Sequence, residues 1–119
     1  MSTRLGVAER RRRKRVTLSV PILVTSQDPG LKLQAVCDTI DVSSNGAQFR
    51  LPIQLPPGTR LRLDILHSNR FTNARVVRSF PGGGKAWKVG VELLHQTGNF
   101  WGLISPPKDW ETADNWDWY

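Results

Sequence analysis

The stretch AWKVGVELL, residues 86–94, alternates between two kinds of side chain. In an extended strand, one face would carry the apolar residues Trp87, Val89, Val91 and Leu93. The opposite face would carry Lys88, Gly90 and Glu92. Because successive side chains of a strand point to opposite faces, this period of two predicts a β-strand with one buried face.

Five further stretches of the chain look like strands. The first, residues 16–24, has the same period and places on one face Val16, Leu18, Val20, Ile22 and Val24. The others are residues 31–42, 47–51, 60–66 and 71–80. Turn-forming clusters separate the stretches: DPG at 28–30, SSNG at 43–46, LPPG at 55–58, HSNR at 67–70 and PGGGK at 81–85.

A succession of short strands without a long helical period predicts an all-β protein. We expect a six-stranded antiparallel β-barrel, because closing the sheet removes the exposed edges that an open sheet would leave. The 119 residues allow one compact domain. Hydrophobic residues (39%) and charged residues (23%) occur in proportions typical of a globular protein, so a packed core is expected.

We divide the chain into three segments. Residues 1–8 are expected to be disordered, and residues 9–95 to form the barrel together with an arginine-rich arm. Residues 96–119 are expected to form a short aromatic and acidic extension, irregular or helical, with room for one helical turn at 99–103 before two prolines end it. The aromatic residues expected to pack on the barrel are Phe100, Trp101 and Trp110.

The positive charge of the chain is concentrated in one place. The formal net charge is +7, and residues 10–15 alone contribute +6. The far end is acidic through Asp109, Glu111, Asp114 and Asp117. Because a nucleic-acid-binding protein usually spreads basic residues over a face or along a helix, this distribution favours the local binding of an anion.

The sequence offers little for catalysis. His67 and His95 lie in or beside predicted turns, without a carboxylate or cysteine at ligand spacing. The single cysteine, Cys37, has no partner for an internal disulfide or a metal site, and we expect a small buried residue in a reducing compartment. The glycines at 82–84 precede Lys85 and a strand, whereas a phosphate-binding loop opens a helix. We therefore predict a protein that is not an enzyme and that uses no metal and no cofactor.

Signals for membranes and secretion are equally weak. The longest apolar run, VPILV at residues 20–24, is far shorter than the roughly 20 residues that span a bilayer. No apolar secretory segment follows the basic start. The expected location is the cytoplasm, without membrane insertion.

The basic stretch ERRRRKRV, residues 9–16, runs directly into the first predicted strand. Taken alone, such a run is typical of a solvated patch that attracts any polyanion. Five of its six basic residues are arginine, however. A guanidinium group can bind a phosphate or the O6/N7 edge of guanine with two hydrogen bonds, and it can stack on a base. Both interpretations stay open for this run by itself.

The stretch DVSSNG, residues 41–46, also has two interpretations. Asn-Gly is the preferred pair for a type I′ hairpin, in which both central residues need a positive φ, so Asn45 and Gly46 predict a tight turn. Asp41 and Ser43 could then bond to backbone amides of that turn. Alternatively, a carboxylate on a rigid turn can accept the N1 and N2 donors of guanine, while the glycine lets a planar ligand approach the backbone.

Together, the two stretches resemble the PilZ domain family of bacterial cyclic di-GMP receptors. The first shared feature is RRxxxR at Arg10, Arg11 and Arg15. The second, about 25 residues later, is DxSxxG at Asp41, Ser43 and Gly46. The resemblance covers roughly residues 9–95 and includes the stretches LPPGTRLRLDIL, NARVVR and VGVEL, the last with Gly90. Residues 96–119 fall outside it.

The resemblance implies a six-stranded barrel whose N-terminal arm folds over cyclic di-GMP. Arg11 and Arg15 would hold phosphate and guanine. Asp41 and Ser43 would contact a guanine, and Gly46 would permit the turn. The ligand set is completed by an arginine before the motif, which in the family accompanies a stacked pair of ligand molecules; here it is Arg10.

The arginine register has one alternative, in which Arg12 and Arg13 replace the first two arginines. The position of Arg15 directly before the strand supports the assignment given above. Repulsion among six like charges predicts a disordered arm without ligand, and ligand phosphates would order it against the barrel. The output would be a conformational signal to a downstream protein partner.

Two other functions stay open. A PilZ-like barrel could act as a protein-interaction adaptor that binds no nucleotide, although the presence of both motifs argues against this. A small basic β-barrel could also bind single-stranded nucleic acid through its arm and an aromatic platform. Most aromatic residues, however, lie in the acidic C-terminal third, where phosphates would be repelled.

Overall fold

The computed structural model describes residues 15–94, 99–104 and 106–107, and its regular elements are all β-strands. The strands are β1 (Val16–Thr17), β2 (Pro21–Ser26), β3 (Gln34–Ser43), β4 (Gly46–Leu51), β5 (Arg60–Ile65), β6 (Phe71–Pro81) and β7 (Trp87–Leu94). Within these ranges, no helix is long and apolar enough to cross a membrane. The prediction of an all-β protein is confirmed.

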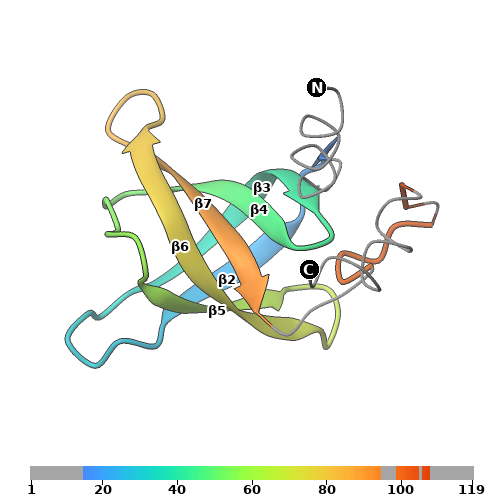
Figure 1. The fold of residues 1–119 in the computed structure, drawn as a ribbon, viewed down its shortest axis with the longest axis horizontal. Coiled ribbons are helices and arrows are strands. Elements are labelled where there is room, and N and C mark those ends of the chain that lie inside the picture. The colour runs from blue at the N-terminus through green and yellow to red at the C-terminus, as the bar shows by residue number, and fades with distance from the viewer. Residues whose placement is uncertain (1–14, 95–98, 105, 108–119) are drawn as a thin grey trace, which may run out of the picture.

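Antiparallel pairing closes six of the strands into a barrel (Figure 1). Hydrogen-bonded neighbours follow the order β3-β2-β5-β6-β7-β4, and β3 also pairs with β4, which closes the ring. The extra strand, β1, pairs with β3 beside Val42. Each strand of the ring therefore has a neighbour on both sides, as the six-stranded barrel predicted from the sequence requires.

The predicted first strand, residues 16–24, is interrupted. Its two parts, β1 and β2, both pair with β3, and the chain leaves the strand conformation at residues 18–20. This gap lies opposite a register shift between β3 and β4. Thr39 bridges the gap, because its Oγ1 donates to Leu18 O and accepts a hydrogen bond from Val20 N. The prediction of one continuous strand was wrong, although its apolar residues still face the core.

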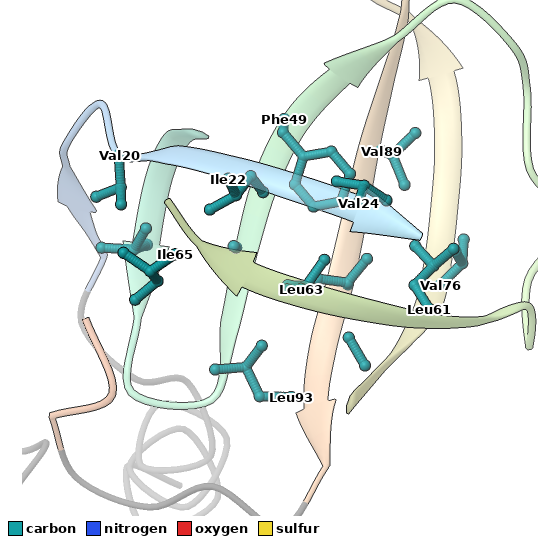
Figure 2. Close-up of a cluster of buried hydrophobic side chains, with 14 of the residues drawn as sticks. Val20, Ile22, Val24, Phe49, Leu61, Leu63, Ile65, Val76, Val89 and Leu93 are labelled. Carbon is teal, nitrogen blue, oxygen red and sulfur yellow. The ribbon is translucent and has the colours of Figure 1, made fainter. Parts of the chain in front are cut away.

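Aliphatic side chains around the ring of Phe49 fill the barrel interior (Figure 2). They come from all six strands of the ring, including Val42 on β3, so every wall of the barrel contributes to one shared core. Burying each such side chain stabilises the fold by about 1.5–3 kcal/mol. The alternation predicted for residues 86–94 is confirmed, because the buried residues of β7 include Val89, Val91 and Leu93.

The described part of the C-terminal extension forms a hydrogen-bonded turn. Gly102 N donates to Asn99 O at 3.1 Å. The side chain of Asn99 bonds both the amide nitrogen and the carbonyl oxygen of Leu103. Gly102 has a φ of +77°, which a right-handed helix excludes. Of the two forms expected for the extension, irregular or helical, its described residues adopt the irregular one.

Two aromatic residues of the extension pack on the barrel. Phe100 and Trp101 are each 6% exposed and belong to the same buried cluster as the barrel core. Their ring centroids lie 4.9 Å apart, with the rings edge to face. The predicted packing of these two residues is confirmed, whereas Trp110 lies outside the described residues.

Replacing Thr39 with valine should lower the free energy of unfolding by about 1–3 kcal/mol, because Leu18 O and Val20 N lose a buried partner while the side-chain volume is kept. Thr25→Val, at a half-buried position of β2, is the matched control. Urea unfolding followed by tryptophan fluorescence would measure both variants. Wild-type stability in Thr39→Val would contradict the bridging role of this hydroxyl.

Candidate functional site

A row of residues crosses the outer surface of the barrel from β1 to β6. Cross-strand pairing joins them in the order Thr17, Asp41, Gln48, Gly90 and Arg78. Their sequence neighbours Val42, Phe49 and Val89 are buried in the core. Because successive side chains of a strand alternate between its faces, the row lies on the side away from the core.

Part of this row forms the floor of a hollow of about 380 Å³ that is open to solvent. Gly90 lies at the floor, between the side chains of Gln48 and Arg78. A Cβ built on Gly90 would lie 3.8 Å from Arg78 Cγ and 3.9 Å from Gln48 Cγ, at ordinary contact distance. The glycine therefore leaves an open gap between two polar side chains. The hollow is also lined by Ala47, Val77 and Val91.

Four of the residues that the sequence assigned to a ligand line this hollow: Arg15, Asp41, Ser43 and Gly46. Arg15 reaches it because Val16, the next residue, pairs with Val42, which follows Asp41. The two motifs, far apart in the sequence, therefore meet in one place. The other two assigned residues, Arg10 and Arg11, lie outside the described residues.

The turn between β3 and β4 differs from the predicted one. Ser43 pairs with Gly46, so the two loop residues are Ser44 and Asn45 rather than Asn45 and Gly46. Gly46 begins β4, and its φ is not in the left-handed region. A Cβ at this position would lie 2.9 Å from Val91 O on β7. The prediction that Gly46 supplies a positive φ was wrong, because the glycine instead allows the close approach of β7.

Hydrogen bonds from two other parts of the chain hold this turn. Leu93 N on β7 donates to Asn45 O at 2.8 Å. Trp101 Nε1 in the extension donates to Ser43 O at 2.8 Å. Within the turn, Ser43 Oγ donates to Asn45 Oδ1 at 3.1 Å. The turn beside the hollow is therefore supported by both β7 and the extension.

In a comparison with protein families, the model of the PilZ domain matches residues 9–100. The chain belongs to the PilZ domain family. Domains of this family bind and regulate rather than catalyse, and the family is known for cyclic di-GMP receptors.

Among solved structures, the chain is similar to the PilZ domain of CeSA from a cellulose-synthesizing bacterium. The TM-score is 0.52 at 20% sequence identity, and the match covers 68% of this chain and 80% of that chain. At this identity the likeness shows a shared fold. Comparison with curated proteins gives no match.

A β-bulge in β3 turns Asp41 of this PilZ domain outward. Thr39 pairs with Phe49 and Asp41 pairs with Gln48, which leaves Ile40 between them without a partner on β4. Thr39 is buried, so regular alternation would point Asp41 into the core as well. The extra residue changes the phase of the strand and brings the carboxylate to the hollow.

A second bulge, in β6, turns Arg78 outward to the hollow. Arg78 was not assigned to the site from the sequence. Val76 pairs with Val91 and Arg78 pairs with Gly90, which leaves Val77 between them unpaired. Val76 is buried, so regular alternation would point Arg78 inward. Gln48 and Gly90 also line the hollow without having been assigned to the site. For Gly90 the signals were its place on the polar face of its strand and within the stretch VGVEL.

The charges around the hollow are mixed. Arg15 and Arg78 supply two guanidinium groups and Asp41 supplies a carboxylate. Among the described residues, none of these three groups has an ion-pair partner. A guanidinium can bind phosphate or the O6/N7 edge of guanine, and a carboxylate can accept hydrogen bonds from donors on a base. The hollow therefore suits a ligand that carries both phosphate and a purine with donor groups.

Groups suited to other chemistry lie elsewhere or do not occur in the described part of the chain. Burial, with a smaller contribution from the carboxylate of Asp38, raises the pKa of the Cys37 thiol to about 11. At neutral pH this residue is therefore a protonated thiol and a poor nucleophile. Across residues 15–94, 99–104 and 106–107, no three side chains are grouped so as to hold a metal ion.

Replacing Gly46 with alanine should lower the free energy of unfolding by about 1–3 kcal/mol, because the new methyl group meets Val91 O and a strand must shift. Gly90→Ala is the matched control, since its methyl group meets side-chain carbons at ordinary distance. Its stability should stay within about 0.5 kcal/mol of wild type or rise. Thermal and urea unfolding would compare the two, and equal stabilities would rule out close approach as the reason for Gly46.

Proposed function

We propose that this PilZ domain binds cyclic di-GMP at the hollow and acts as a receptor, not as an enzyme. The observation that supports this most directly is the convergence of Arg15, from the first motif, with Asp41 and Ser43, from the second. Membership of the PilZ family supports the same ligand, since the family is known for cyclic di-GMP receptors.

The groups of the ligand match the groups of the hollow. The guanidinium of Arg15 binds a phosphate or the O6/N7 edge of a guanine with two parallel hydrogen bonds. The carboxylate of Asp41 accepts the N1 and N2 donors of a guanine, and Ser43 contacts the same base. Arg78 on β6 lies on the other side of Gly90 from Gln48, and there it offers a second guanidinium to the ligand.

The arm completes the site in this proposal. Arg11 precedes Arg15 by four residues, and an extended segment of that length spans about 13 Å. This reach allows Arg10 and Arg11 to close over a ligand that lies in the hollow. Ligand phosphates offset the repulsion among the basic residues at 10–15, so binding orders the arm on the barrel. A downstream protein partner then recognises the new surface.

Arg11→Ala and Arg15→Ala should each weaken cyclic di-GMP binding by at least about tenfold, equivalent to roughly 1.4 kcal/mol, because each removes a charge-assisted contact. Asp41→Ala should also weaken binding, and it should reduce the preference for cyclic di-GMP over cyclic di-AMP. Titration calorimetry on the folded variants measures both effects, and it also gives the number of ligand molecules bound.

The control for these variants is Arg60→Ala, which removes the same charge from β5, outside the hollow. Unchanged affinity in both Arg11→Ala and Arg15→Ala would contradict the assigned site. No binding heat from the wild-type protein would favour a protein-interaction adaptor. Salt-dependent binding to random oligonucleotides, with no competition from cyclic di-GMP, would favour a nucleic-acid-binding barrel.

A further inference from the structure

A contact from outside both motifs reaches the turn that carries Ser43. Trp101 lies 58 residues after Ser43 in the sequence, yet its indole Nε1 donates to Ser43 O at 2.8 Å in a buried environment. The described part of the extension, drawn in orange to red in Figure 1, runs beside the β3–β4 hairpin. A buried hydrogen bond to a carbonyl oxygen restricts the backbone at that residue, because leaving the oxygen without a partner is unfavourable.

The β3–β4 turn depends on contacts from its surroundings. The hydroxyl of Ser44 is buried and has no hydrogen-bond partner among the described residues. The backbone bond from β7 reaches Asn45 rather than Ser43. On the Ser43 side, the indole of Trp101 therefore adds a hydrogen bond from outside the hairpin, next to the pairing of β1 with Val42.

The indole is itself held in place. Arg70, directly before β6, donates from Nη1 to Phe100 O at 2.9 Å and to Asn99 O at 3.1 Å. Asn99 Oδ1 accepts a hydrogen bond from Leu103 N at 2.9 Å, and Asn99 Nδ2 donates to Leu103 O at 2.6 Å. These bonds fix the chain before and after Trp101, so the barrel presents the indole to Ser43 from a well-supported loop.

We propose that Trp101 is a positioning residue of the ligand site, whose indole N–H fixes the Ser43–Gly46 turn so that Asp41 and Ser43 face the hollow before ligand arrives. This inference rests on the proposed binding of cyclic di-GMP. Without the bond, the turn has more conformations, and ligand binding must restrict them, which lowers the affinity. By linkage, bound ligand favours the docked extension by the same factor.

The extension thereby has a role that neither motif describes. The family match ends at residue 100, one position before Trp101. The residue that supports the turn therefore lies beyond the matched region, although its partner Ser43 lies within the second motif. Cyclic di-GMP affinity and the docking of the extension should change together.

Trp101→Phe keeps an aromatic ring and removes the N–H donor. Titration calorimetry of the full chain should show cyclic di-GMP affinity reduced about three- to tenfold, as expected for the loss of one buried hydrogen bond. Without ligand, hydrogen exchange of the Asn45 and Gly46 amides should become faster, while that of the β5 amides stays unchanged. The matched control is Trp87→Phe on β7, outside the hollow, which should leave both measurements as in wild type.

Arg70→Ala is a second variant, which keeps the indole of Trp101 but weakens the support of the loop that carries it. It removes the donor to the carbonyl oxygens of Asn99 and Phe100, so it should weaken binding in the same direction by a smaller factor. Arg60→Ala controls for the loss of one positive charge.

The outcomes separate this inference from the proposed function. If wild-type protein gives no binding heat, the proposed function fails and the positioning role fails with it. If wild type binds while Trp101→Phe and Arg70→Ala bind equally tightly, the positioning role is overturned and the proposed function stands. Faster exchange throughout the barrel, together with a lower melting temperature, would show that Trp101 affects stability alone, which also overturns the positioning role.

Discussion

The candidate site depends on two one-residue shifts of strand register, at Ile40 in β3 and at Val77 in β6. Strands alternate strictly between faces, so without the shifts Asp41 and Arg78 would both point into the core. A buried charge without a partner is far more unfavourable than an unpaired ladder position, so the register shifts are the less costly arrangement. Beside the first shift, the hydroxyl of Thr39 bonds to Leu18 and Val20 across the gap between β1 and β2. The candidate site therefore depends on irregularities that are part of the fold itself.

Sequence alternation predicted the barrel because most strands follow a local rule, as Val89, Val91 and Leu93 do on β7. A bulge follows no such rule. The sequence NARVVR does not show which of its side chains face the core. The pairing with β7 decides that Arg78 faces outward. Gly46 shows the same limit: the Asn-Gly pair locally indicates a type I′ turn, whereas the distant carbonyl of Val91 decides why the residue is glycine. Both features are set by contacts between residues far apart in the sequence, which a local sequence pattern does not predict.

The convergence of the two motifs has a simple origin in strand pairing. β1 pairs antiparallel with the end of β3, where Val16 meets Val42 and Thr17 meets Asp41. Any residue directly before β1 must therefore lie beside the β3–β4 turn, whatever its side chain. This register explains why Arg15, immediately before the strand, lines the hollow with Asp41 and Ser43. The sequence motifs assigned these three residues to one site by family resemblance, and the pairing gives the physical reason that they lie in one place.

The entropic cost of ordering the arm in the proposed mechanism explains why groups already held by the barrel matter for binding. In the proposed mechanism, ligand binding restricts residues 10–15, and ordering a backbone disfavours binding by about 1–2 kcal/mol per residue. A hydrogen bond to a charged group contributes about 1.5–3 kcal/mol, so one such contact from each of Arg10, Arg11 and Arg15 at most offsets the ordering of the arm. Net affinity must therefore come largely from groups that are already in position, namely Asp41, Ser43 and the floor at Gly90. Leu93 and Trp101 hold the turn next to these groups through hydrogen bonds to Asn45 O and Ser43 O, so residues that do not touch the ligand would also influence the proposed binding.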